Sequence, residues 1–136
     1  MNIARHLALI EELCFRPFPA EHGYHIAELE SSHGLRGRDS AERAVTVDQY
    51  EKVRDGIYEE LAPRWGETTP WNLQTVLLRT EREEIPEPWA TLSARARVAY
   101  GWEVVGTGRW AAVAVADRDE ADEVQLVAVV TETDPP

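Results

Sequence analysis

Cysteine is almost absent from this chain, and that scarcity excludes two kinds of covalent or metal cross-link. The 136 residues include one cysteine, Cys14, so there is no intramolecular disulfide and no zinc site built on cysteines. Cys14 continues the helical series Ile3, Leu7 and Ile10. This position favours a small buried side chain, with a nucleophilic thiol as the alternative.

Long hydrophobic runs are missing as well. No apolar run approaches the roughly 18 residues that a membrane-spanning helix needs. Glu11 and Glu12 interrupt the N-terminal apolar run, which makes it too short for a secretory signal peptide. We therefore expect a cytoplasmic protein that has no membrane partner.

Positive charge is the third scarcity. Lys and Arg number 14 against 25 Asp and Glu, which gives a net charge of -11. A field of this sign repels nucleic acid and anionic membranes and attracts basic proteins and cations. The composition predicts no nucleic-acid partner and permits a basic protein partner.

Recognisable catalytic signatures are also missing. There is no Gly-x-Ser-x-Gly elbow, no His-Glu-x-x-His motif and no long glycine-rich phosphate loop. Gly106-Thr-Gly108 resembles the start of a phosphate loop, but a hairpin turn between two predicted strands explains both glycines. Because 25 carboxylates offer many acid and base pairs, an enzyme is disfavoured without being excluded, and no cofactor is predicted.

The residues that are present predict one folded domain over 1–136. Hydrophobic residues make up 43% and five are Trp, which is enough for a core in a chain of this length. Residues 102–131 predict a β-meander, because the Val-rich runs 110–116 and 124–131 are short and bounded by turn residues. Such runs are typical of strands buried on both faces.

Two helices are predicted before the meander. The first covers residues 3–14, with Asn2 as its N-cap. The second begins at the capping box Thr46-Val-Asp-Gln49 and ends near residue 62, before Pro63 and Gly66. Gly56 in its interior suggests close packing against a sheet, or nothing in particular.

The remaining segments are read less directly. Residues 24–30 fit an edge strand or one helical turn, and residues 31–39 fit a surface loop. Residues 71–78 alternate like a strand, and the proline-punctuated stretch 81–88 fits an extended surface connection. Period-two alternation from Ser93 predicts a strand with a bulge at Gly101, although residues 89–99 could begin as a helix capped by Thr91.

The resulting expectation is an α+β fold in which about two helices pack on one face of a four-stranded, mainly antiparallel sheet. The opposite face would then need a cover, which a second copy of the chain could supply as a homodimer. Trp102 and Trp110 are expected in the core, whereas Trp65, Trp71 and Trp89 could close the core or border a recognition site.

Two groups of acidic residues are the candidate partner-binding sites. One is a stripe at helical spacing on the second helix, and the other is the connection between the last two strands. A solvated face is the simpler interpretation of both, and a docking surface for a basic protein is the sharper one. The candidate residues are Glu51, Asp55, Glu59, Asp117, Asp119, Glu120, Asp122 and Glu123.

Histidines offer a weaker site. All four precede residue 34, and His22 and His25 with Glu21 could supply three zinc ligands, with His33 nearby. The spacing matches no known motif, so no metal is predicted. Three functions remain: a non-catalytic inhibitor of a basic protein, in the manner of an immunity protein or antitoxin; a small-ligand module or small enzyme; and a structural homodimer subunit.

Overall fold

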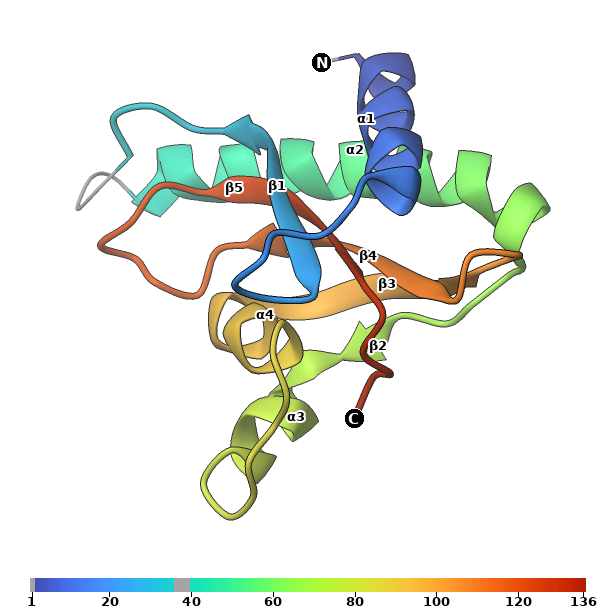
Figure 1. The fold of residues 1–136 in the computed structure, drawn as a ribbon. Helices are drawn as coiled ribbons and strands as arrows, with labels where there is room; N and C mark the ends of the chain where they lie inside the picture. Colours follow the sequence, from blue (N-terminus) through green and yellow to red (C-terminus); the bar gives the residue numbers. More distant parts are fainter. Residues whose placement is uncertain (1, 36–39) are drawn as a thin grey trace.

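The computed structural model describes residues 2–35 and 40–136 and has an α+β architecture (Figure 1). This class agrees with the sequence, although the described residues form more helices and strands than were predicted. The elements in chain order are α1 (Ile3–Phe15), β1 (Tyr24–Ser31), α2 (Ser40–Trp65), β2 (Trp71–Asn72), α3 (Leu73–Arg79), α4 (Trp89–Arg95), β3 (Ala96–Val104), β4 (Arg109–Ala116) and β5 (Gln125–Thr131).

The strands form one antiparallel sheet in the order β1-β5-β4-β3-β2. The predicted meander is confirmed as β3, β4 and β5, and β4 and β5 are almost entirely buried. Gly106 and Gly108 both have positive φ values in the turn between β3 and β4, as a hairpin requires. Residues 24–31 form an edge strand, so the strand interpretation of this segment is confirmed and the helical turn is not.

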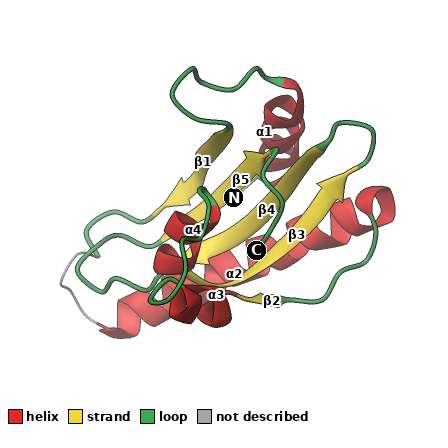
Figure 2. Cartoon of the chain, turned by 60° about the horizontal axis from the view of Figure 1, so that its bottom comes forward, coloured by secondary structure: helices red, strands yellow, loops and turns green. Residues whose placement is uncertain are grey.

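Helices cover both faces of the sheet, not one. On one face α1 and α2 pack against alternate residues such as Val113 and Leu126, and on the other α3 and α4 pack against Ala114 and Val127. Figure 2 shows α2 and the pair α3 and α4 on opposite sides of the strands. The reason for expecting a homodimer, an uncovered face, is therefore removed, and the homodimer itself stays a prediction.

The start of α2 differs from the predicted capping box. The helix begins at Ser40, so Thr46 lies inside it and donates its hydroxyl to the Glu42 carbonyl at 3.1 Å. A threonine that bonds back four residues remains compatible with a helix, and the capping pattern was misleading for that reason. Pro63 lies in the last turn, and Gly66, with φ of 106°, ends the helix by donating to the Ala62 carbonyl.

Two short segments predicted as strand are helical. Only Trp71–Asn72 is extended, because the Asn72 side chain accepts from the Gln74 amide at 2.9 Å and starts α3. Ser93 belongs to α4, as the alternative interpretation allowed, although Thr91 is not its cap. The irregularity in β3 lies between Ala96 and Ala99 and not at Gly101.

The tryptophans also divide differently from the prediction. Trp102 is buried in the core as expected, and Trp110 is only half-buried. Trp89 is 1% exposed and donates its indole N–H to the Thr133 carbonyl at 3.0 Å, so it is a core residue of the α3 and α4 layer. None of the described helices combines the length and the apolar composition needed to cross a membrane.

Gly56 allows α2 to approach α1, and not the sheet. A Cβ placed on Gly56 would lie 2.6 Å from the Ile3 Cδ1 atom. Gly56→Ala should therefore gain little or no stability in the native chain, because Ile3 must move. In an Ile3→Val background, which lacks that atom, the same change should stabilise the protein by about 1 kcal/mol. Chemical denaturation of the four proteins measures this coupling, and an equal gain in both backgrounds would contradict it.

Candidate functional site

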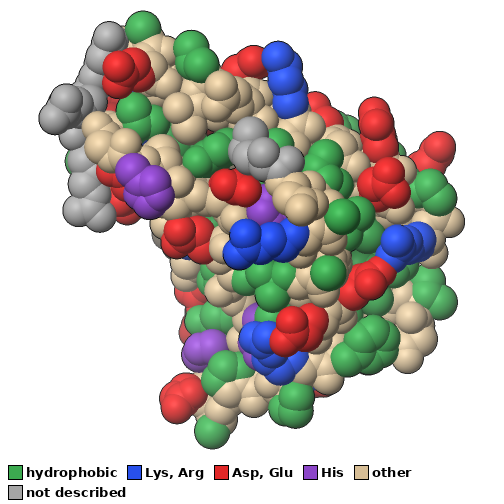
Figure 3. Space-filling view, turned by 90° about the horizontal axis from the view of Figure 1, so that it is seen from above, with side chains coloured by type: hydrophobic (Ala, Val, Ile, Leu, Met, Phe, Trp, Pro, Cys, Tyr) green, Lys and Arg blue, Asp and Glu red, His purple; other side chains and the backbone are tan. Residues whose placement is uncertain are grey.

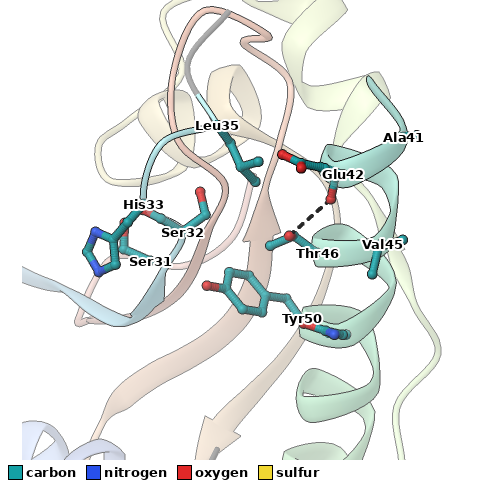
Figure 4. Close-up of a pocket in the computed structure, with 10 residues that line it drawn as sticks. Ser31, Ser32, His33, Leu35, Ala41, Glu42, Val45, Thr46 and Tyr50 are labelled. Atoms are coloured by element: carbon teal, nitrogen blue, oxygen red, sulfur yellow. Dashed lines mark hydrogen bonds between the residues drawn. The ribbon is translucent and has the colours of Figure 1, made fainter. Parts of the chain in front are cut away.

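The first half of α2 separates two features that together form the candidate site. On one side lies a groove of about 700 Å³ between α2 and the segment that begins at the end of β1. On the other side lies the acidic turn, which we define as residues 117–123 between β4 and β5. Figure 4 shows the groove, with Ser31 and Ser32 on one wall and Val45, Thr46 and Tyr50 on the α2 wall.

The acidic turn is organised around Arg43. Arg43 is 9% exposed, and its guanidinium donates to the backbone carbonyls of Asp122 at 2.7 Å, Asp119 at 2.8 Å and Asp117 at 3.3 Å. The turn therefore binds the Arg43 guanidinium through its backbone carbonyl oxygens and not through its carboxylates. Sequence reasoning missed Arg43, whose only signal was a basic residue three positions before the start of a predicted helix.

Several carboxylates of the turn also support the fold. Glu123 accepts hydrogen bonds from the Ser32 hydroxyl at 2.9 Å and the Leu35 amide at 3.0 Å, so it ties the turn to the groove wall. Asp119 accepts from the Ala121 amide and Asp122 from the Glu123 amide, as acidic residues in turns commonly do. Their predicted role in binding a partner stays a prediction alongside these internal contacts.

The predicted stripe on α2 meets the acidic turn at one end only. Glu51 lines a cavity of about 330 Å³ together with Asp117 and Glu120, beside Arg43 and Arg97. Asp55 and Glu59 follow at one and two further turns, so Glu59 lies about 12 Å along the axis from Glu51. Arg54 pairs with Asp55 at 3.0 Å and approaches Glu51 at 3.9 Å, which partly neutralises the stripe.

The groove has an apolar floor in a negative field. Leu35 and Tyr50 are buried, whereas Val45 on the rim is 59% exposed. Burial raises the pKa of Tyr50, and the charges of Glu30, Glu123 and Glu28 raise it further. In Figure 4 the Tyr50 hydroxyl points away from α2 into the groove. A cation placed there would be attracted by the same carboxylates.

Acidic side chains are not confined to this site. Figure 3 shows them scattered over the face around α1, with a few Lys and Arg side chains between them. Some are paired across the fold: the buried His6 Nε2 lies 2.8 Å from Glu30 Oε2 and joins α1 to β1. Charge alone therefore does not single out a docking surface, and the groove is distinguished by its apolar floor.

The other histidines do not assemble with acidic side chains. His22 Nδ1 lies 3.1 Å from the Tyr24 carbonyl, and its ring stacks on Tyr24. His25 Nε2 lies 3.3 Å from the Arg16 carbonyl, and His33 lines the groove. Within residues 2–35 and 40–136, no three His, Cys, Asp or Glu side chains are grouped so that they could hold a metal ion. The zinc alternative with Glu21 gains no support.

Arg43 should be important for stability. Arg43→Met would leave three carbonyls without their donor, so we expect a loss of about 2 to 3 kcal/mol in the free energy of unfolding. Lys52→Met is the control, because its ammonium is exposed and pairs with an exposed carboxylate, Asp48, on the helix surface. The control should cost less than about 0.5 kcal/mol in the same denaturation experiment, and equal losses would disprove the role of Arg43.

Cys14 should be inert in the folded protein. It is 2% exposed, and burial raises the pKa of its thiol to about 11, against a smaller lowering by Arg109. The folded thiol then holds its proton where the unfolded thiol, whose ordinary pKa is 9.0, has lost it. Stability should accordingly fall between pH 9 and pH 11, and Cys14→Ala should reduce that fall. Rapid alkylation of the native protein at neutral pH would contradict this.

The site is thus a groove on one side of α2 and an acidic turn on the other, linked through Glu123. Its chemistry is apolar contact surrounded by negative charge. No protein-family model matches the chain, and searches of curated proteins and of solved structures gave no significant match.

Proposed function

We propose that the chain is a non-catalytic module that binds and inhibits a basic protein, in the manner of an immunity protein or antitoxin. The observation that carries the proposal is the groove, where an apolar floor lies within the field of Glu28, Glu30 and Glu123. A basic protein offers both an apolar anchor and positive charge to such a place.

The apolar part of the groove supplies the anchoring contact. Leu35 and Tyr50 are held by the core, while Val45 is exposed beside them. A side chain inserted between these residues removes apolar surface from water on both partners, at about 25 cal/mol per Å² before the costs of association. Aromatic and arginine side chains are the usual anchors at such points.

The charge supplies selectivity and speed. With a net charge of -11 the chain attracts basic proteins at long range. Glu51, Asp117 and Glu120 lie on the opposite side of the first half of α2 from the groove, where they would add to this attraction at the rim. Rim charges of this kind accelerate encounter more than they increase affinity.

A small cationic ligand is the second candidate. A volume of about 700 Å³ falls in the range of ligand pockets, which favours this possibility. The groove is open to solvent, however, and a small molecule there would remain largely hydrated. A protein partner that inserts one side chain and rests its surrounding surface on the rim excludes water from an open groove more completely, and we therefore place the protein partner first.

A photo-crosslinking amino acid at position 45 tests the proposal in extracts of cells of the protein's own source, where the salt concentration can be varied. The matched control carries the same group at position 78, because Val45 and Leu78 are 59% and 50% exposed and lie on opposite layers. We expect a basic protein to be linked at position 45 and not at 78, with a yield that falls as salt is raised.

Three outcomes would overturn the proposal: equal linking at both positions, an acidic protein as the linked product, or a yield that salt does not change. A small molecule linked at position 45, without a linked protein, would instead support the small cationic ligand. A linked second copy of this chain would support the homodimer hypothesis.

A further inference from the structure

We infer that the basic partner binds as an extended segment that adds a strand to the free edge of β1, with one apolar side chain in the groove. This inference rests on the proposed function and deepens it, because it specifies how the partner is recognised. Strand addition supplies affinity through main-chain hydrogen bonds and selectivity through alternate side chains.

The free edge of β1 is long enough for such pairing. β1 has eight residues and pairs on one side with β5, whereas the opposite edge of the sheet is β2, which has two. For residues 24–31, the described backbone hydrogen bonds go to β5, apart from the Tyr24 carbonyl near His22. Figure 2 shows β1 at the outer border of the sheet, with chain only at its two ends.

The side chains of β1 decide which occupant fits. Proteins commonly protect an open edge with lysine, proline or a bulge, and β1 has a bulge between Glu28 and Glu30 but neither of those residues. Its acidic side chains are Glu28 and Glu30, and it has no Lys or Arg. The bulge places Glu28 on the face of Val127, where it accepts from the Gln125 side-chain amide at 3.0 Å. Glu30 lies on the face of Leu126, beside His6. Two copies of β1 placed edge to edge would bring four carboxylates to one interface, two from each copy. A segment rich in Arg or Lys would pair with them instead.

The edge and the groove are continuous. Ser31 is the last residue of β1 and also lines the groove, next to Ser32 and His33 (Figure 4). A segment that pairs along β1 and continues past Ser31 therefore reaches the apolar floor at Leu35 and Tyr50. Alternation in a strand sends every second side chain to one face, so basic and apolar residues of the segment can serve both places.

A display library of random eight-residue peptides, selected on the intact chain at low ionic strength, tests the inference first. We expect the selected peptides to carry Lys or Arg on both faces of an extended strand, with β-branched or aromatic residues among them. Selection of acidic peptides, of peptides with a three-to-four residue spacing, or of none would overturn it.

Methylation of single backbone amides in the best peptide tests the pairing directly, because it removes one donor and leaves the charge unchanged. Blocking an amide that faces β1 should weaken binding roughly 2- to 12-fold, and blocking its neighbours should have a much smaller effect. An alternating pattern of loss is expected only for a paired strand. Uniform small effects would disprove strand addition while leaving salt-dependent binding, and so the proposed function, intact.

A charge reversal on the protein completes the test. Glu28→Lys places a positive charge on the edge, and Glu84→Lys makes the same change in net charge in the exposed connection between α3 and α4. We expect Glu28→Lys to weaken the selected peptide at least about 10-fold and Glu84→Lys to weaken it less than about 3-fold. Equal weakening by both variants would show long-range attraction without docking on β1. Loss of salt dependence in the unmodified chain would instead contradict the proposed function.

Discussion

The apolar character of β4 and β5 on both faces is the constraint on which the rest of this structure depends. Residues 110–116 and 125–131 place hydrophobic side chains on both faces of the sheet. Each face must therefore be covered by another layer. The helices α1 and α2 cover one face, and α3, α4 and Trp89 cover the other. Two short helices are thereby required where the local pattern alone suggests strands.

Covering the first face also creates the candidate site. The long helix α2 crosses the sheet, and its first half extends toward the ends of β1 and β4. Arg43 fastens the acidic turn to this part of α2, and Glu123 fastens the turn to Ser32 and Leu35. Arg43 with its three carbonyl acceptors and Glu123 with its two donors thus connect α2 and the segment after β1, which form the two groove walls, through the same turn. The groove therefore depends on how the acidic turn before β5 is connected to α2 and to the segment after β1.

This arrangement concentrates negative charge around the groove. In the sequence the carboxylates are spread along the chain, and many of them pair locally, as Glu51 and Asp55 do with Arg54. Around the groove, Glu28, Glu30 and Glu123 act together on the buried Tyr50 beside an apolar floor and an unpaired strand edge. Apolar contact, attraction for cations and main-chain hydrogen bonding are available within one region, and this combination suits an extended basic segment of a protein.

The sequence by itself determined the elements whose periodicity is long or whose composition is extreme: the first helix with its Asn2 cap, the core of α2 and the Val-rich meander. Local pattern wrongly predicted a strand over residues 71–78 and left residues 89–99 open between strand and helix, because seven helical residues are too few for the two spacings to differ clearly. What lies opposite such a segment decides its conformation, and here that is the second face of the sheet. The site depended on tertiary structure even more, since Arg43, Tyr50 and Glu123 come together only when distant segments pack, and burial then changes what each polar group can do.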